Sequence, residues 1–253
     1  MNSPIPLPKR YLFQIGLAGK TVQIESSYRR IYDECRAYLV QGAVPDLFVS
    51  PSRESLAAMT AEALTPDGQP QGPWMPTEDV QESMAVCTEI ANSLLSSDLM
   101  LMHGAVVAKD GFGYMITAPS GTGKTTRLLR WLEAYPDSVV VNGDKPLVQL
   151  SDDPPLAYGT PWCGKEGMST NMAVPLRAIF CLERAGVNRV TRLSPAAAYL
   201  SLFPMVYQPA DIEASRRVLR LLRRLISQVA VYRFQSEPTR EAVRLAWESA
   251  RPR

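Results

Sequence analysis

The stretch Ala118-Pro-Ser-Gly-Thr-Gly-Lys-Thr-Thr126 decides the fold expected for this chain. The apolar run Tyr114–Thr117 precedes it and has the composition of a buried strand. After it come Leu128, Leu129 and Trp131, whose spacing is typical of one face of a helix. A strand, a glycine loop and a helix start in this order build an anion site, because backbone N–H groups and the positive end of the helix converge on phosphate oxygens. The stretch therefore predicts a phosphate-binding loop.

The residue types of this loop point to a nucleoside triphosphate with magnesium. Lys124 is expected to reach the β- and γ-phosphates, and the Thr125 hydroxyl is expected to ligate Mg²⁺. The alternative is a glycine turn that only joins a strand to a helix. Ala118 departs from the usual pattern, which begins with glycine. The residues expected to bind the nucleotide phosphates are Ser120, Gly121, Thr122, Gly123, Lys124, Thr125 and Thr126.

Composition gives no reason to expect nucleic acid or a membrane as the main partner. Hydrophobic residues make up 46% of the chain, charged residues 21%, and the formal net charge is only +2. Basic residues gather late in the chain and interleave with apolar ones, which predicts an amphipathic helix with a solvated basic face. The alternative is a surface for an anionic partner or a substrate phosphate. These basic residues are Arg216, Arg217, Arg220, Arg223 and Arg224.

Cysteine and histidine usage predicts a reduced, cytoplasmic protein. The four cysteines have neither metal-like nor redox-like spacing. The sequence shows no apolar signal segment and no apolar run long enough to span a bilayer. With His103 as the single histidine, a His-rich metal site is excluded.

The sequence predicts two parts, a small α+β N-terminal unit over 1–95 and a larger domain over 96–253. In the first, strand-like runs at 11–16 and 21–24 flank Ala18-Gly19 and predict a hairpin. Helices are expected at 28–39 and 77–95, a short strand at 47–49, and a loop at 65–73.

The larger domain is expected to be α/β with a mixed sheet and helices on its faces. Two of its strands, 100–108 and 113–117, are joined by the turn Lys109-Asp110-Gly111 and should be antiparallel. The other expected strands are 138–141, 147–150, 178–182 and 231–234. The helices expected after the loop helix are 195–202, 211–229 and 239–247.

One run of residues resembles a known family. His103-Gly-Ala-Val-Val-Ala-Lys-Asp-Gly-Phe-Gly-Tyr-Met-Ile-Thr-Ala-Pro-Ser-Gly-Thr-Gly-Lys-Thr125, followed by Asn142-Gly-Asp144, looks like HPr kinase/phosphorylase. The match is closer to the broader group of HPr-kinase-like small kinases, which includes kinases of lasso-peptide precursors. These share a phosphate-loop fold with ATP-type phosphoenolpyruvate carboxykinase. The resemblance covers roughly residues 100 to 245 and implies a P-loop kinase domain of that type.

The resemblance assigns roles to two further residues. A histidine at the position of His103 sits near the acidic centre and the transferred phosphate. Asp144 matches an aspartate that orients magnesium and takes the proton from the accepting hydroxyl. The residues alone agree, since an apolar strand that ends in a carboxylate would hold magnesium opposite Thr125. The alternatives are a core histidine bonded to backbone and a solvated turn aspartate.

The chain also departs from the family. A second aspartate is expected beside Asp144, but Gly143 and Lys145 flank it. Glu166 or Glu183 is a candidate substitute, and Lys145 could itself neutralise phosphate charge. The reverse, phosphorylase activity is therefore in doubt, and the N-terminal part does not look like the regulatory domain of the bifunctional enzyme.

The segment Tyr158-Gly-Thr-Pro-Trp-Cys-Gly-Lys-Glu-Gly167 is the candidate site for the phosphate acceptor, because it lacks helical or strand periodicity and carries polar and aromatic groups. The alternative is a turn packed over the sheet edge by Trp162. The residues expected to contact the acceptor are Trp162, Lys165, Glu166 and Arg177.

Together these observations predict an ATP- and Mg²⁺-dependent kinase in which Lys124, Asp144 and His103 act on the transferred group. The expected acceptor is a hydroxyl, either a serine (free or in a peptide) or a small hydroxylated metabolite. Two rivals stay open: an ATP-binding regulator that has lost catalysis, and a metabolic enzyme like phosphoenolpyruvate carboxykinase. The resemblance also leaves a homo-oligomer open.

Overall fold

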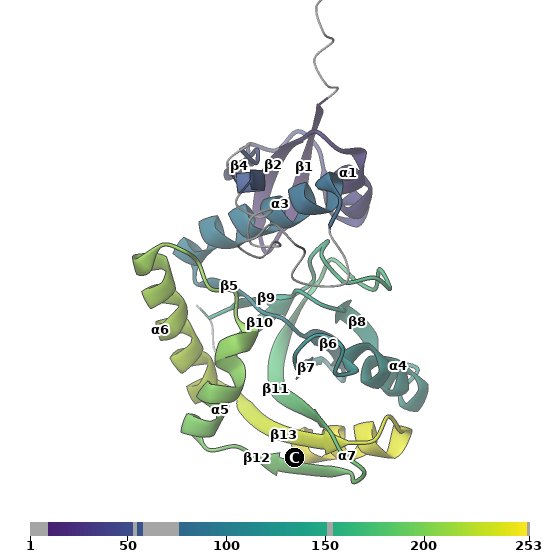
Figure 1. Cartoon of the computed structure of the whole chain (residues 1–253). Coiled ribbons are helices and arrows are strands. Elements are labelled where there is room, and N and C mark those ends of the chain that lie inside the picture. Colours follow the sequence, from purple (N-terminus) through teal and green to yellow (C-terminus); the bar gives the residue numbers. More distant parts are fainter. Residues whose placement is uncertain (1–9, 53–54, 58–75, 151–153, 252–253) are drawn as a thin grey trace, which may run out of the picture. The chain divides into compact units, whose positions relative to one another are not determined.

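The computed structural model describes residues 10–52, 55–57, 76–150 and 154–251. It divides into two compact units, Met1–Ser93 and Leu94–Arg253 (Figure 1). The loop expected at 65–73 lies outside the described residues. Within them, none of the helices is both long enough and apolar enough to cross a bilayer.

The first unit is built on a four-stranded sheet with the order β3-β1-β2-β4. The predicted hairpin is confirmed: β1 pairs with β2 antiparallel, and Ala18 and Gly19 turn the chain with φ of 51° and 74°. The short β4 adds to β2 in parallel. The strands are β1 (Tyr11–Leu17), β2 (Lys20–Ser26), β3 (Leu39–Val40) and β4 (Leu47–Val49).

One helix of the first unit is shorter than expected over 28–39. Helix α1 (Arg29–Glu34) ends at Cys35, where φ of −85° and ψ of 0° leave the α-helical conformation. A 3₁₀ turn, Arg36–Tyr38, then carries the Tyr38 ring into the core, so burial of that ring overrides the helical periodicity. The expected second helix is confirmed as α3 (Glu78–Leu94), which lies across one face of the sheet (Figure 1).

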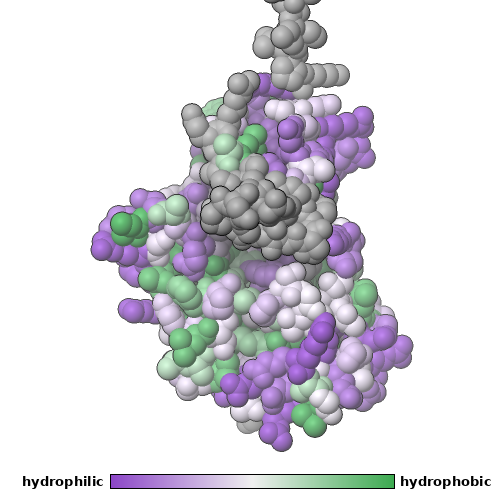
Figure 2. Space-filling view, viewed as in Figure 1, coloured by the Kyte–Doolittle hydropathy of each residue, from purple (hydrophilic) through white to green (hydrophobic). Residues whose placement is uncertain are grey.

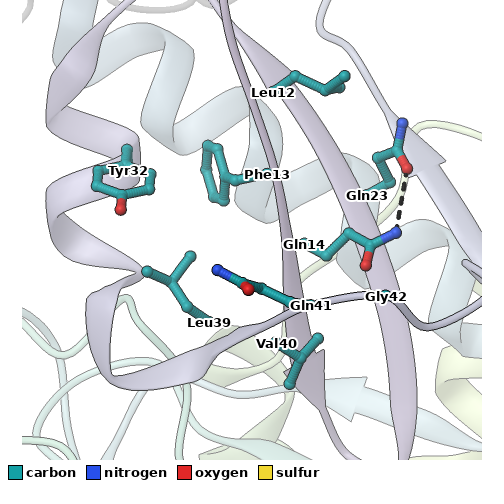
Figure 3. Close-up of a pocket in the computed structure, with 9 residues that line it drawn as sticks. All are labelled: Leu12, Phe13, Gln14, Gln23, Tyr32, Leu39, Val40, Gln41 and Gly42. Atoms are coloured by element: carbon teal, nitrogen blue, oxygen red, sulfur yellow. Dashed lines mark hydrogen bonds between the residues drawn. The ribbon is translucent and has the colours of Figure 1, made fainter.

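A groove of about 500 Å³ opens on this first unit (Figure 3). Its lining is apolar and amide-bearing, and the side chains of Gln14 and Gln23 are hydrogen-bonded to each other there. No charged residue lines it among the residues that the structure describes. Among the described residues that line the groove, Tyr32 carries the one titratable side chain.

The second unit contains a nine-stranded mixed sheet, as the mixture of strand and helix signals predicts. Seven strands follow the order β5-β9-β10-β11-β7-β6-β8, and β13 and β12 continue from β11. Strand β11 is parallel to β7 and β13, whereas β6 is antiparallel to β7 and β8. The strands are β5 (Leu99–Leu101), β6 (Ala105–Lys109), β7 (Phe112–Thr117), β8 (Val139–Asn142), β9 (Leu147–Gln149), β10 (Leu156–Tyr158), β11 (Ala173–Arg184), β12 (Arg189–Arg192) and β13 (Ala230–Ser236).

Helices cover both faces of this sheet and enclose two hydrophobic cores (Figure 1). One core contains Leu202 and Leu222 from α5 and α6, and the other contains Trp131 and Val243 from α4 and α7. The helices are α4 (Lys124–Ala134), α5 (Pro195–Leu202), α6 (Ile212–Gln228) and α7 (Arg240–Ala250).

The last three helices begin within one residue of their predicted starts. The side chains of Ser194, Asp211 and Thr239 each accept a hydrogen bond from a backbone N–H in the first turn of their helix. Over α5 and the start of α6, large apolar side chains remain exposed (Figure 2). They are Leu200, Phe203 and Ile212.

Candidate active site

The expected strand, loop and helix are present in the order that an anion site needs. Strand β7 ends at Thr117 and α4 begins at Lys124. Between them, Gly121 and Gly123 have φ of 76° and 104°, a left-handed conformation that other residues rarely adopt. A Cβ at Gly123 would also lie 2.7 Å from the Arg127 guanidinium. The two glycines therefore let the backbone curl around a small central space.

On the helix that follows, the predicted apolar face is only partly correct. Leu128 and Trp131 are fully buried, but Leu129 is 45% exposed. Leu128 and Leu129 are consecutive in the sequence, so they project about 100° apart around the helix axis and cannot both face the core.

Lys124, the expected phosphate-binding lysine, is buried. Only 8% of the residue is exposed, and its Nζ donates to the Ala118 carbonyl oxygen at 2.8 Å. Burial lowers the pKa of Lys124, and the nearby negative charge of Asp144 opposes that shift. The ammonium group therefore lies folded against the carbonyl groups that open the loop, with the Asp144 charge close by.

Two arginines that the sequence did not single out brace this loop. Arg184, at the end of β11, donates to the carbonyl oxygens of Gly121 and Thr122. Arg127 is 4% exposed and donates to the Ser236 carbonyl oxygen at 2.6 Å. Arg184 thus holds the loop through two of its backbone carbonyl groups, and Arg127 links the start of α4 to the end of β13.

The strand expected over 100–108 is interrupted. Strand β5 ends at Leu101 and pairs with β9, whereas β6 begins at Ala105 and pairs with β7 and β8. The interruption lies at His103 and Gly104, which the unbroken apolar pattern concealed. There the His103 carbonyl oxygen accepts a hydrogen bond from Thr117 Oγ1 at 2.6 Å. The break therefore places His103 beside the start of the phosphate loop.

The same break brings His103 to Asp144. Gly104 N–H donates to the Asp144 carbonyl oxygen at 2.8 Å, and His103 Nε2 lies 3.2 Å from Asp144 Oδ1. The other carboxylate oxygen, Oδ2, is 2.7 Å from Lys145 Nζ. Burial alone would raise the pKa of Asp144, but the hydrogen bond from His103 and the charge of Lys145 outweigh it and hold the pKa well below its usual value. Asp144 is therefore a partly buried carboxylate, not a solvated turn residue.

Asn142 fixes the turn that carries Asp144, and the sequence analysis gave it no role. It is completely buried, and its Oδ1 accepts the backbone N–H groups of Asp144 and Lys145 at 2.8 and 2.7 Å. Its Nδ2 donates to the carbonyl and hydroxyl oxygens of Thr160 at 3.0 Å. Thr160 Oγ1 in turn donates to the Lys145 carbonyl oxygen at 2.7 Å. The Asn-Gly-Asp order, typical of tight turns, was the available signal.

This network ties the turn to the expected acceptor segment, 158–167. A Cβ at Gly143 would lie 2.5 Å from the Cys163 carbonyl oxygen, so only glycine permits the approach of the two backbones. Tyr158 belongs to β10, which corrects the expectation that the whole segment lacks strand structure. Trp162 is buried, as in the packed-turn alternative, whereas Lys165 and Glu166 are exposed.

The two candidate substitutes for the missing aspartate differ in position. A Cβ built on Gly164 would lie 3.3 Å from Asp144 Cβ and 3.7 Å from Glu166 Oε2, so Glu166 lies near Asp144. Glu183 instead forms an ion pair with Arg233 at 3.1 Å. The structure thus brings Glu166, but not Glu183, toward the candidate site.

Arg177, an expected acceptor contact, lies away from the phosphate loop. It stands near the start of the paired part of β11, opposite Gly113 and Tyr114, whereas the loop follows the other end of β7. Its Nε donates to the Ala250 carbonyl oxygen at 3.1 Å. Arg177 therefore belongs to a different surface of this unit.

Metal binding at the candidate site would require ligands from the nucleotide. Among the described residues, no group of three or more His, Cys, Asp or Glu side chains is placed to hold a metal ion. Oxygen donors suit Mg²⁺, which usually takes one or two protein ligands together with substrate phosphates and water. Thr125 at the start of α4 and Asp144, whose charge acts on Lys124, both carry oxygen donors of this kind.

Comparisons with known proteins add no assignment. No protein-family model matches the chain, and no curated protein matches its sequence. The functional argument therefore depends on the residues and their geometry.

Proposed function

We propose that this protein is a kinase that uses Mg²⁺ and ATP to phosphorylate a hydroxyl group. The observation that carries the proposal is the His103–Asp144 pair, held by backbone hydrogen bonds beside the expected phosphate loop. A loop that only binds a nucleotide needs no paired carboxylate and imidazole next to it. In a kinase these are the groups that receive the acceptor hydroxyl.

The nucleotide phosphates would be bound by the loop backbone and by the N-terminus of α4. The N–H groups from Ser120 to Thr126 would donate to phosphate oxygens, and Lys124 would turn from the Ala118 carbonyl group toward the β- and γ-phosphates. Thr125 and Asp144 would hold Mg²⁺. The metal ion supplies positive charge where the phosphates carry negative charge.

In the transfer step, the acceptor oxygen would form a bond to the γ-phosphorus while the bond between that phosphorus and the ADP oxygen breaks. Asp144 would accept the hydroxyl proton, with His103 orienting its Oδ1. The low pKa of Asp144 makes it a weak base. In phosphoryl transfer this suffices, because much of the catalysis comes from positioning and charge stabilisation.

The acceptor would lie beside the 158–167 segment. The Asn142–Thr160 network and the close approach of Gly143 to Cys163 hold this segment next to Asp144. The exposed Lys165 and Glu166 would contact it. A serine hydroxyl, free or in a peptide, is the first acceptor class, and a small hydroxylated metabolite is the second.

One observation favours a second function, an ATP-binding regulator without turnover. The second aspartate that the resemblance implies beside Asp144 is absent, and Lys145 Nζ already lies 2.7 Å from Asp144 Oδ2. A permanent pair there would compete with Mg²⁺ for the carboxylate. Such a protein would bind ATP and transfer nothing.

The test incubates the purified full-length protein with γ-labelled ATP, Mg²⁺ and a size-fractionated extract of the source cell. Transfer of label that is lost in Lys124→Ala supports the kinase, and the fraction that carries the label separates a peptide from a metabolite acceptor. ATP bound without transfer supports the regulator. Label transfer that Lys124→Ala retains would refute the proposed role of the loop.

A further inference from the structure

A second cleft lies at the opposite end of the β7–β11 pair from the phosphate loop. It measures about 620 Å³ and is bounded by the first half of β11, by β12, and by the ends of α6 and α7. Three arginines from separate elements line it: Arg177, Arg192 and Arg251. None of its lining residues in the described part of the chain is acidic.

None of these three arginines forms an ion pair with a described residue. Arg177 donates to the Ala250 carbonyl oxygen, and the Arg251 guanidinium lies 5.2 Å from the centre of the Trp247 ring. Arg192, exposed on β12 opposite Tyr232, makes no side-chain hydrogen bond or ion pair with any described residue. Helices α6 and α7 both end at this cleft, and each C-terminus contributes about half a negative charge. The three positive charges of the guanidiniums exceed this, so the net charge at the cleft is positive.

Backbone geometry also directs Arg177 toward the cleft. Leu176 pairs with Gly113 and Ala178 pairs with Tyr114, so Arg177 is the extra residue of a β-bulge. A bulge re-aims the side chain of the extra residue relative to the regular alternation of the strand. In addition, the side-chain oxygen Oε1 of Gln228 is buried and has no donor within the described structure.

We propose that this cleft binds a phosphate-bearing anion at a site separate from the phosphate loop. Planar guanidiniums recognise phosphate through pairs of N–H donors, and three of them around one cleft suit a doubly or more highly charged group. A protonated phosphate oxygen or an ester hydroxyl would supply the donor that Gln228 Oε1 lacks. Occupancy of the site does not require the kinase activity proposed above.

The experiment titrates the full-length, ¹⁵N-labelled protein with pyrophosphate without Mg²⁺ and follows each backbone amide by NMR. Saturable shifts at Tyr232, Ser249 and Arg251 are expected, and shifts at the phosphate loop report binding there separately. Arg192→Gln should weaken binding at the cleft by about tenfold, since a charge-assisted hydrogen bond to phosphate is lost. Arg189→Gln, an exposed arginine on the same strand that does not line the cleft, is the matched control and should leave binding unchanged.

A second variant, Ser249→Asp, places a carboxylate in the cleft and should abolish the shifts there. Equal affinity for the native protein and Arg192→Gln would overturn the proposal. So would shifts that sodium chloride reproduces at the same ionic strength, because they would report screening of the arginines and not a bound anion.

Discussion

At the scale of single residues, the candidate site depends on how Asp144 divides its two oxygens. Oδ1 lies 3.2 Å from His103 Nε2 and Oδ2 lies 2.7 Å from Lys145 Nζ. A magnesium ion that binds this carboxylate must displace or share one of these partners. Lys145, on a flexible stem, is the easier partner to move, because His103 is held through its backbone to Met205 and Thr117.

Lys145→Ala is therefore expected to lower the Mg²⁺ concentration that gives half-maximal transfer, by about tenfold, since a cation that competes for Oδ2 is removed. Initial rates over a Mg²⁺ series at saturating ATP measure this. A lower kcat with an unchanged Mg²⁺ requirement would contradict it. That result would instead mean that Lys145 neutralises charge on the transferred phosphate.

Lys124→Ala should abolish transfer and also affect folding, because Lys124 is buried. Loss of its hydrogen bond to the Ala118 carbonyl group is expected to reduce the free energy of unfolding by about 1–2 kcal/mol. Denaturant unfolding and ATP-dependent label transfer measure the two effects. Arg130→Gln, on an exposed turn of the same helix α4, is the control and should change neither by much. Full transfer by the Lys124 variant would exclude its role.

At the scale of elements, the turn 142–145 and the acceptor segment 158–167 are held together by hydrogen bonds and by a close backbone contact. Asn142 binds backbone groups on its own turn and on Thr160, and Gly143 lets the Cys163 carbonyl group approach. Gly143→Ala should therefore reduce the free energy of unfolding by about 2–3 kcal/mol and reduce transfer, since a Cβ would overlap the carbonyl oxygen.

Gly186→Ala supplies the comparison for this prediction, because a Cβ there would meet nothing within 4 Å. It should change stability by less than about 0.5 kcal/mol. Thermal unfolding and label transfer on both variants test the pair. Equal effects of the two substitutions would mean that the close approach at Gly143 does not support the site.

Local signals predicted much of this architecture. The order of strand, glycine loop and helix around residues 118–126, the first hairpin and the starts of the last three helices are confirmed, because each depends on neighbouring residues. The break between β5 and β6 was missed, since His103 and Gly104 lie inside a long apolar run whose two halves pair with different strands. The short β10 and β12 were also missed; β12 is a polar strand stabilised by pairing with β13.

The sequence predicted the main residues of the candidate site, but not the residues that hold them in position. The loop pattern identified Lys124 and Thr125, and the resemblance pointed to His103 and Asp144. Asn142 and Thr160, which position Asp144, are separated by a strand and a loop, so only the folded chain brings them together. Arg184 is a similar case, since its contacts with the phosphate loop cross 63 residues of sequence.

At the scale of the whole molecule, the four cysteines lie in different surroundings, which should give their thiols different reactivities. Cys35 and Cys87 are buried in the first unit, and burial raises the pKa of Cys35 far above its usual value. In the second unit, Cys163 and Cys181 are both partly exposed; desolvation raises the pKa of Cys181 to about 12, and Cys163 lies beside Gly143. The thiolate is the reactive form, so these environments set different reactivities.

We expect iodoacetamide at pH 8 to alkylate Cys163 first, and Mg-ATP to slow that reaction if the proposed site binds it. With a pKa of about 12, only about one in ten thousand Cys181 side chains is a thiolate at pH 8, and the fraction rises about tenfold per pH unit below the pKa. Its alkylation rate should therefore increase steeply from pH 7 to pH 9 while the protein stays folded.

Mass spectrometry of timed digests measures each cysteine separately. Cys35 should stay unmodified over the same range and serves as the internal control. Alkylation of Cys181 as fast as that of Cys163 would contradict its raised pKa. A rate of Cys163 alkylation that Mg-ATP does not change would place the nucleotide away from the Asp144 turn.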